Sequence, residues 1–422
     1  MASIKFDFLK LRSLKLKIHL PIIVLLLLLS LLYVYFRYVE NKQYVKIGVL
    51  HSLTGTMAAS ETPLVDAVQF AVEEINDSGG LNGIPVKIIV ADCRSDANFC
   101  AQEAQRLISI EKVNALFGCW TSDCRIAVKN VVEKYNLLLF YPLQYEGLEK
   151  SSNIIYTGST PNQQIMPMVI WALQNKGKRY YLIGSDYIFP RIANFMIKEV
   201  LNIYGGYLMG ERYLPMGSKD MAIVVNEISA LKPDFVVNTL NGDSNTSFFH
   251  ALYAAGIKAA KIPVFSTSIA EVELQTIGPT YVEGHYAAKN YFQSLDTHEN
   301  KIHVEAFKNR FGKNRVLDDP MESSYVGVIL WANAVREISS TDSDILKSIL
   351  MHQTFHSPQG IVSIDYNTQH LWQKVFIGQA EANGQFNIVW KTDQSVRPVP
   401  YPVFHNIEEW KKIKEYLSGV KR

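Results

Sequence analysis

The chain has 422 residues, of which 48% are hydrophobic and 11% aromatic, so it can form two globular domains and is not a disordered protein. Its 42 Lys and Arg residues nearly balance its 40 Asp and Glu residues, which leaves a formal net charge of +2. Because the body of the chain contains no basic block, the composition gives no reason to expect nucleic-acid binding.

The amino-terminal segment predicts a membrane anchor. Lysines and an arginine within residues 1–19 precede residues 20–36, an uncharged apolar run that would span roughly 25 Å as a helix. No small-x-small cleavage site follows this run, and the first cysteine is Cys93, so a lipoprotein is not supported. We expect a cytoplasmic segment at 1–19, an uncleaved transmembrane signal anchor at 20–39, and the remainder outside, in an oxidising compartment. A signal peptide cut at an atypical site is the alternative.

From residue 45 onward, short β-branched runs alternate with amphipathic helical segments, which is typical of a parallel sheet covered by helices. In the first series the pattern predicts strands at 45–50, 86–92, 114–118 and 137–142. Between them it predicts a loop through Pro63, a helix from Asp66 that stops at Gly79-Gly80, and helices at 101–109 and near 123–135. These elements form one α/β lobe.

A second series of the same order follows, without a detectable sequence repeat. It predicts helices near 165–175, from 190, near 219–230 and near 246–256, and strands at 180–184, 207–213, 234–240 and 262–267. Helical patterns at 299–312 and 322–338 then precede a hairpin across Asn383-Gly384. A chain of this order crosses between its lobes more than once, and multiple crossings form a hinge. We expect an α/β protein of two doubly wound parallel-sheet lobes, with lobe 1 at 45–160 and 290–350, lobe 2 at 161–289 and 351–405, and a helical tail at 406–422.

Ligands of open parallel α/β sheets bind beyond the carboxyl ends of the strands. The loops expected there are rich in Ser, Thr, Asn and aromatic residues and poor in paired opposite charges: 51–55, 92–96, 118–123, 141–147, 184–191, 240–245 and 266–271. Such loops would hold a small polar ligand by hydrogen bonds, between aromatic rings.

Several of these segments resemble a known family. HSLTGTMA at 51–58, FGCWTSDCRIAV at 117–128, FYPLQYEGLE at 140–149, IGSDYIFPR at 183–191 and NTLNGDSN at 238–245 are similar to the extracytoplasmic urea-binding proteins of ABC transporters and to the related bacterial amide receptor. The resemblance extends over nearly the whole body of the chain. It implies a type I periplasmic binding protein, a two-lobed Venus flytrap that closes on urea or a short aliphatic amide. The chain departs from the amide receptor at Leu143 and Phe189, where that receptor has threonine and tyrosine, so both ligand classes stay open.

The same resemblance implies a set of ligand-facing residues: Trp120, Ser122, Tyr141, Gln144, Tyr187, Asn241 and Asp243. Their chemistry suits a planar amide. Ser122 stands where a helix is expected to begin, so its hydroxyl and the free N–H groups of that helix could donate to a carbonyl oxygen. Rings such as Tyr141 offer flat faces, and Gln144 or Asp243 could accept from N–H groups. The alternatives are an Asp243 that only caps a helix and aromatic residues that only fill the core.

The cysteines do not predict a metal or redox site. Cys119 and Cys124 lack the spacing of such a pair, and no histidine lies beside them. Together with Cys93 and Cys100 they allow three disulfide pairings, between which the sequence does not choose, and buried thiols are the alternative.

No catalytic set is recognisable. Ser122-Asp123 lacks a nucleophile elbow. His352 and His356 lack the glutamate of a zinc protease, and we expect them in a loop near an interlobe crossing. We therefore expect a binding protein without a cofactor, a metal or enzymatic activity, with amide hydrolysis as the disfavoured alternative. Its expected partner is an ABC permease that receives the ligand, or a membrane sensor that reads closure, on the outer side of the cytoplasmic membrane.

Overall fold

The computed structural model describes residues 25, 28–30 and 44–419. Residues 1–44 and 45–422 form separate units, and the second contains the folded body. The cytoplasmic segment and the anchor expected at 1–19 and 20–39 lie outside the described residues, apart from residues 25 and 28–30, which are helical and exposed. Within the described part of the chain, no helix combines the length and the apolar character needed to cross a membrane.

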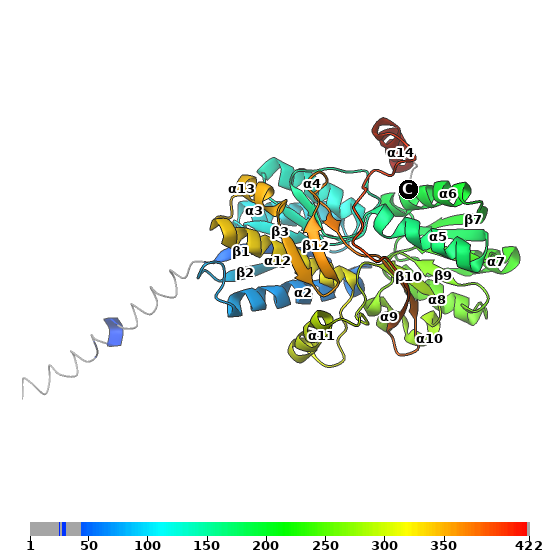
Figure 1. The fold of residues 1–422 in the computed structure, drawn as a ribbon, viewed down its shortest axis with the longest axis horizontal. Coiled ribbons are helices and arrows are strands. Elements are labelled where there is room, and N and C mark those ends of the chain that lie inside the picture. Colours follow the sequence, from blue (N-terminus) through cyan, green and yellow to red (C-terminus); the bar gives the residue numbers. More distant parts are fainter. Residues whose placement is uncertain (1–24, 26–27, 31–43, 420–422) are drawn as a thin grey trace, which may run out of the picture. The chain divides into compact units, whose positions relative to one another are not determined.

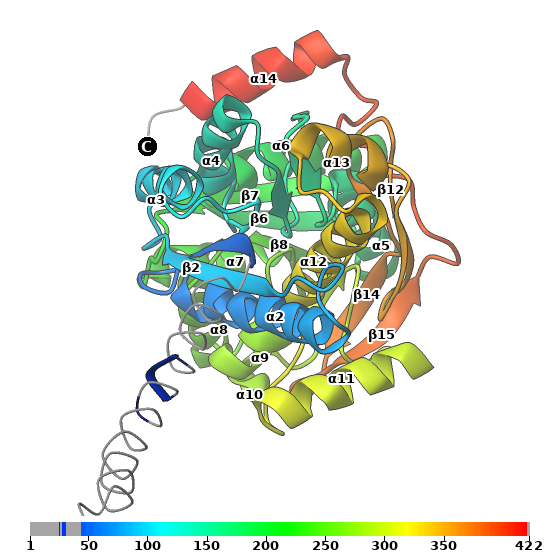
Figure 2. The same ribbon diagram turned by 90° about the vertical axis from the view of Figure 1, so that its left-hand side faces the viewer.

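The first lobe contains a fully parallel sheet with the strand order β2-β1-β3-β4-β5, of which β1, β2 and β3 are labelled in Figure 1. Its strands are β1 (Val45–His51), β2 (Val86–Asp92), β3 (Ala115–Gly118), β4 (Leu139–Tyr141) and β5 (Ile154–Tyr156). Helices α2 (Ala58–Asp77) and α12 (Asp319–Ile338) cover one face, and α3 (Ala97–Ser109) and α4 (Ser122–Tyr135) cover the other (Figure 2). Strands β3, β4 and β5 are buried throughout, as strands covered on both faces must be. The sequence predicts β1 to β4 but not β5, whose three residues are too few to show a period.

Helix α2 begins at Ala58, so the prediction of a loop through Pro63 and a helix from Asp66 is wrong. Tertiary contacts hold the additional turns. Glu61 Oε2 bonds to His51 Nδ1 at 3.1 Å and accepts from the Ser52 backbone N–H at 2.9 Å. Such buried bonds outweigh the single backbone hydrogen bond that Pro63 cannot donate inside the helix.

The second lobe contains a mixed sheet with the order β15-β14-β10-β9-β8-β6-β7. Its parallel strands are β6 (Arg179–Ser185), β7 (Tyr207–Leu214), β8 (Phe235–Thr239), β9 (Val264–Ser266) and β10 (Tyr286–Lys289). The predicted hairpin across Asn383-Gly384 is confirmed as β14 (Phe376–Ala380) and β15 (Phe386–Lys391), which join this sheet antiparallel. Helices α5 (Ile165–Lys176) and α6 (Ile188–Ile203) pack on one face, and the opposite side carries α7 (Ala222–Leu231), α8 (Ser244–Ala254), α9 (Glu271–Ile277) and α10 (Pro279–Val282).

The chain passes between the two sheets after β5, after β10 and again before β14, which agrees with the expected hinge of several crossings. A short helix η1 (Pro161–Gln163) follows the first crossing, and α11 (His298–Phe311) follows the second, packing against α2. Helix α13 (Ser343–Leu350) leads into a small antiparallel sheet beside α12, made of β11 (Thr354–Ser357), β12 (Gly360–Ile364) and β13 (Leu371–Trp372). Helix α14 (Ile407–Gly419) packs against α6.

The expected loop is confirmed at His352, which lies in the turn after α13, but is wrong at His356, which lies within β11 and pairs with Ile361 of β12. A tight connection between Ser357 and Gly360 turns the chain into this hairpin. The strand is visible only through its pairing, since four residues before a proline carry too little pattern to separate a strand from a loop.

The core of the first lobe is centred on Trp331 of α12, which is fully buried and meets the Phe117 ring edge-on, with 5.8 Å between ring centroids. We expect Trp331→Ala to lower the free energy of unfolding by about 3–5 kcal/mol, because it removes a large apolar side chain and leaves a cavity. Guanidinium chloride unfolding followed by circular dichroism measures this change. Ile302→Ala on α11, where the side chain is 55% exposed, is the control and should leave the midpoint almost unchanged. Equal midpoints for the two variants would contradict this account of the core.

Candidate functional site

A cavity of about 280 Å³ lies where strand ends of the two lobes face each other. The first lobe contributes residues after β1, β2 and β3, and the second contributes Asp186, Tyr187 and Met216. Its charged lining side chains are all acidic: Glu61, Asp96, Asp123 and Asp186. Among the described residues, no lysine or arginine lines this cavity. Hollows of about 610 and 630 Å³ exist along α11 and beside β15, but they lie away from the strand ends at which ligands of this fold class bind.

Hydrogen bonds join the two lobes across the cleft, so the structure represents a closed arrangement. Trp120 Nε1 donates to Asn241 Oδ1 at 3.1 Å, and Gln144 Nε2 donates to Ser268 Oγ at 3.3 Å. Ser60 Oγ donates to Glu273 Oε1 at 2.7 Å. Each of these bonds has one partner on the first lobe and one on the second, so opening the cleft breaks them.

Of the seven expected ligand-facing residues, Tyr187 lines this cavity, and the other six are not among its lining residues. Trp120, Ser122, Tyr141, Gln144, Tyr187 and Asn241 are all buried. The Tyr141 hydroxyl donates to the Trp120 backbone carbonyl at 2.7 Å. This bond fixes the Tyr141 ring against the backbone of Trp120. Burial, and then the nearby Tyr141 and Glu146, raise the pKa of the Tyr187 hydroxyl, so Tyr187 of the second lobe lies close to these groups of the first.

Asp243 is placed differently from the other six. It is exposed at the start of α8, and its carboxylate makes no capping hydrogen bond there. Its backbone N–H donates to the Thr56 carbonyl of the first lobe at 3.3 Å. The residue therefore takes part in closure through its backbone.

A buried ionic network lies beneath the start of α4. Arg125 is fully buried and forms ion pairs with Glu146 and Glu149, each at 3.0 Å. Ser122 Oγ donates to Glu146 Oε2 at 2.5 Å and accepts from Arg125 Nη1 at 3.0 Å. Burial alone lowers the pKa of Arg125, but Glu149 and Glu146 outweigh it and hold that pKa above its usual value. The guanidinium stays charged, its charge is compensated, and the Ser122 hydroxyl is held in one orientation.

Aromatic side chains enclose this network. The Arg125 guanidinium lies 4.4 Å from the centroid of the Tyr145 ring, which stacks on Tyr156. Burial lowers the pKa of His370 to about 3, so its ring is neutral. The Thr368 carbonyl can only accept a hydrogen bond, so the single proton of the neutral His370 ring is on Nδ1, which faces that carbonyl. Nε2 is then unprotonated and accepts from the Tyr145 hydroxyl at 2.6 Å.

Arg125, Glu146 and Glu149 were not among the residues expected at the site. A signal was nevertheless present, because Arg125 follows Ser122 by three residues on a predicted helix and so shares its face. Glu146 and Glu149 belong to a motif, FYPLQYEGLE, that the resemblance includes. Their pairing with Arg125 depends on the packing of α4 against the loop after β4.

Among the described residues, the buried polar atoms without a hydrogen-bond partner include Gln144 Oε1, in the side chain that bonds to Ser268 across the cleft, and His51 Nε2, at the end of β1. Buried polar atoms are usually paired, so an unpaired one beside a cleft suggests a group that a ligand or water satisfies.

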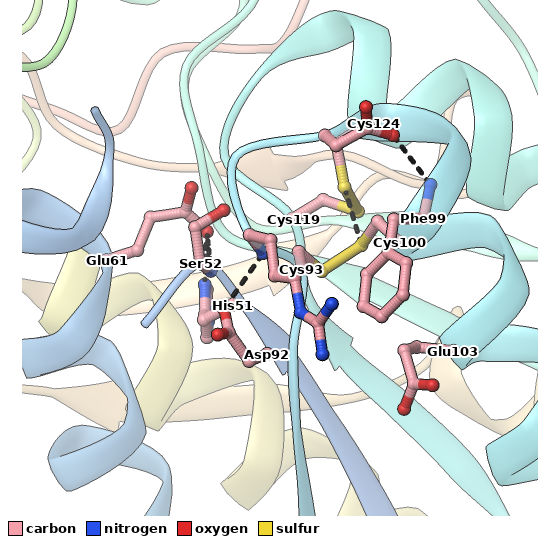
Figure 3. The surroundings of a disulfide bond; sticks show 12 residues. His51, Ser52, Glu61, Asp92, Cys93, Phe99, Cys100, Glu103, Cys119 and Cys124 are labelled. Carbon is pink, nitrogen blue, oxygen red and sulfur yellow. Dashed lines mark hydrogen bonds and ion pairs between the residues drawn. A yellow bond between two sulfur atoms is a disulfide. The ribbon is translucent and has the colours of Figure 1, made fainter. Parts of the chain in front are cut away.

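The four cysteines form two disulfides, Cys93–Cys100 and Cys119–Cys124, beside the cavity (Figure 3). This selects one of the three pairings that the sequence leaves open. Among the described residues, Cys93, Cys100 and Cys124 are the only group of three or more side chains whose donor atoms lie close enough together for a metal. Their sulfurs are engaged in disulfides.

Residues 45–407 match the family model of the periplasmic binding protein domain. The chain belongs to this family. Over 341 residues it is 23% identical to Leu/Ile/Val-binding protein homolog 6 of Brucella suis, which covers 79% of this chain and 86% of that relative. It is 39% identical over 124 residues to a limonene hydroxylase of Geobacillus stearothermophilus, but that match covers 29% of this chain and only 23% of that relative.

A solved structure has the same architecture. The solute binding protein of an ABC transporter from Rhodopseudomonas palustris, solved with p-hydroxybenzoic acid, superposes with a TM-score of 0.78 at 22% identity, over 86% of this chain and all of that chain. At this identity the likeness shows the fold alone. With the family match, it confirms the predicted type I periplasmic-binding-protein fold. The Brucella suis relative, which is matched over 86% of its length, is named a binding protein. This name agrees with the expectation that the chain is a binding protein and not an enzyme.

The hinge of this periplasmic binding protein contains an excess of buried acid. The carboxylates of Glu271, Glu273, Asp318, Asp319 and Glu322 are buried, and the fully buried Lys289 lies among them. Burial raises the pKa of Asp318 to about 8, with a further contribution from Glu273, and burial raises the pKa of Glu322 to about 8. The folded protein therefore holds protons on this cluster at pH values where an unfolded chain has released them.

This difference predicts a falling stability with rising pH. Above about pH 7 the buried His285, His303 and His370 are neutral in the folded and the unfolded state, so they no longer oppose the acids. In this range the acids still bind protons in the folded state that the unfolded chain has released, so the free energy of unfolding decreases as pH rises through about 8. Thermal unfolding by circular dichroism should give a lower midpoint at pH 9 than at pH 7. In Glu322→Gln the drop should be smaller, because the amide does not ionise, whereas Glu283→Gln at an exposed position should retain the full drop. A drop of equal size in all three proteins would argue against this role of Glu322.

Proposed function

We propose that this protein is an extracytoplasmic solute-binding protein that closes on a small uncharged amide, either urea or a short-chain aliphatic amide. The observation that carries the proposal is the enclosed set of uncharged polar side chains at the start of α4, with the buried charges beneath it already paired. Because the buried ions at this position already compensate one another, they leave no buried charge to pair with an ionic ligand, and desolvating an uncompensated ion is costly.

The charges of the cleft argue against a carboxylate ligand. Amino acids and benzoates carry a carboxylate, and a buried carboxylate needs a cation or several N–H donors. The described residues that line the cavity include four acids and no base, and Arg125 is paired with two glutamates. The names of the relatives therefore do not transfer directly to the ligand of this chain.

The geometry offers complementary groups to an amide. The amino-terminal end of α4 carries a partial positive charge and lines the cavity with Thr121, Asp123 and Cys124, which suits a carbonyl oxygen. Gln144 Oε1 is a buried acceptor without a partner among the described residues, which suits an N–H group of the ligand. Tyr141, Tyr187 and Trp120 supply rings around a planar molecule.

Closure is needed for useful affinity. Urea and acetamide have few non-hydrogen atoms, and each such atom contributes at most roughly 1.5 kcal/mol of binding free energy. The total therefore reaches at most about 6 kcal/mol, which corresponds to a dissociation constant of about tens of micromolar. Only nearly complete enclosure approaches that ceiling. The hydrogen bonds between the lobes, among them Trp120 to Asn241, stabilise the closed arrangement that provides it.

We further propose that residues 20–39 anchor the protein to the outer side of the cytoplasmic membrane and that the ligand passes to an ABC permease. The uncharged run at 20–36 and the cations before it support the anchor. Membership of the periplasmic binding protein family supports an extracytoplasmic place and a transporter partner. The alternative partner, a membrane sensor that reads closure, would show ligand-dependent crosslinks to that sensor and none to a permease.

Isothermal titration calorimetry of the purified chain with urea, acetamide, formamide, leucine and 4-hydroxybenzoate tests the ligand class. We expect urea or a short amide to bind with a dissociation constant no tighter than about tens of micromolar. Leucine and 4-hydroxybenzoate should give no heat, because the cleft offers their carboxylates no free cation. Binding of either acid, with silence toward every amide, would falsify the proposed ligand class.

Substitutions at the start of α4 test the position of the site. We expect Ser122→Ala and Tyr141→Phe each to weaken amide binding by about tenfold, or about 1.4 kcal/mol. Ser122→Ala removes an oxygen that can still accept from a ligand N–H group, and Tyr141→Phe releases the Trp120 carbonyl that the hydroxyl holds in place. Ser122→Ala should also lower the free energy of unfolding by about 1–3 kcal/mol, because Glu146 loses a buried donor. Glu283→Gln, at an exposed position before β10 and away from the cleft, is the control for binding. If both site variants retain full affinity, the site lies elsewhere.

A further inference from the structure

The four cysteine sulfurs form one cluster beside the cleft, at the starts of α3 and α4 (Figure 3). Cys93–Cys100 joins the loop after β2 to α3, and Cys119–Cys124 joins the end of β3 to α4. Cys124 Sγ lies only 3.0 Å from Cys100 Sγ, which belongs to the other disulfide. Helices α3 and α4 pack against each other, so this contact belongs to the fold of the lobe.

We propose that this cluster is a thiol–disulfide exchange site in which Cys124 is shared between Cys119 and Cys100. A small external thiolate attacks Cys124 Sγ, forms a mixed disulfide and expels the Cys119 thiolate, which takes up a proton. A second external thiolate attacks the sulfur of the bound external thiol, releases Cys124 as a thiolate and leaves as an oxidised disulfide. The Cys124 thiolate then attacks Cys100 Sγ, forms the Cys100–Cys124 bond and expels the Cys93 thiolate, which also takes up a proton. The net change oxidises two external thiols to one disulfide and reduces one of the two protein disulfides.

The cavity gives an external thiol access to the cluster. Cys93 and Cys124 line it, whereas Cys100 and Cys119 are fully buried. An external thiolate can instead attack Cys93 Sγ and expel the Cys100 thiolate, which faces Cys124. The Cys100 thiolate then attacks Cys124 Sγ, forms the Cys100–Cys124 bond and expels the Cys119 thiolate. Both routes therefore converge on a Cys100–Cys124 disulfide, with Cys93 and Cys119 released from their original bonds.

The position of Cys124 favours the exchange. It is the third residue of α4, and its backbone N–H donates to the Thr121 hydroxyl in the helix cap. The positive end of a helix stabilises a thiolate there, and the thiolate is the attacking species. The acids that line the cavity, Glu61, Asp96, Asp123 and Asp186, act against an incoming anion. The reductant class that fits this site is therefore a small thiol that is uncharged or cationic.

Exchange changes the turn that carries the ligand-binding residues. The Cys119–Cys124 bond closes the segment that contains Trp120 and Ser122, and Cys119 has a φ of 65°, in the left-handed region that a residue other than glycine rarely adopts. After exchange this segment has lost its crosslink, while α3 and α4 have gained one. The expected consequence is weaker ligand binding, which rests on the proposed function, whereas the exchange itself does not.

Limited reduction of the wild-type chain tests the exchange. The protein is treated with substoichiometric 2-mercaptoethanol at pH 8, quenched with acid, alkylated with N-ethylmaleimide, digested and mapped by mass spectrometry. We expect a species with Cys100 linked to Cys124, and with Cys93 and Cys119 alkylated, to accumulate before full reduction. Cysteamine should produce it at least several-fold faster than glutathione, which carries a net negative charge. Reduction of each original disulfide without any Cys100–Cys124 peptide would overturn the proposal.

The variant Cys119→Ser tests the same step without a reductant, because it leaves Cys124 without its original partner. We expect the free thiol of this variant to be found partly on Cys93 and partly on Cys124, with matching Cys93–Cys100 and Cys100–Cys124 peptides. In the control Cys124→Ser, Cys93–Cys100 should remain intact and Cys119 should be the only alkylated residue. A free thiol confined to Cys124 in Cys119→Ser contradicts the exchange. These readouts map cysteines, so they are independent of whether an amide binds, and the wild-type experiment decides if a variant fails to fold.

Discussion

The buried pairing of Arg125 with Glu146 and Glu149 is the constraint on which the site depends. It joins the first turn of α4 to the loop after β4, and through Ser122 it fixes the position of a hydroxyl at the cleft. A lone buried guanidinium would be very costly, and so would two lone carboxylates, so the three groups hold one another in place. The rings of Tyr145, Tyr156 and His370 exclude water from this network and thereby keep its interactions strong.

The same network sets the chemical character of the cleft. Because its charges are compensated internally, the surface it offers to a ligand is polar but not ionic. The acids near the cavity add a negative field that repels anions, while the start of α4 adds a local positive end. The proposed ligand, a small amide with both a carbonyl and N–H groups, matches such a surface, and its small size would require the lobes to close around it.

The fold was largely predictable because its elements are long and periodic. Most strands and helices from β1 to α12 follow from alternating apolar runs, although β5, α9, α10 and β10 were not predicted. The β14–β15 hairpin follows from Asn383-Gly384 between two alternating strands. The errors fall where long-range contacts override local pattern. Helix α2 extends through Pro63 because Glu61 reaches His51 and Ser52, and β11 exists because β12 pairs with it.

By itself, the sequence determined the two-lobed α/β architecture and the strand ends at which a ligand site should lie. These features are local, since they depend on periodicity and on neighbouring residues. The resemblance of its motifs to a known family implied the ligand-facing set Trp120, Ser122, Tyr141, Gln144, Tyr187, Asn241 and Asp243. Only the tertiary structure decided the ion pairs of Arg125, the bond from Trp120 to Asn241 across the cleft, the exposure of Asp243, and the pairing of the four cysteines. Each of these joins or separates side chains that lie on different elements, and their distance is set by how the helices and sheets pack, which no local pattern encodes.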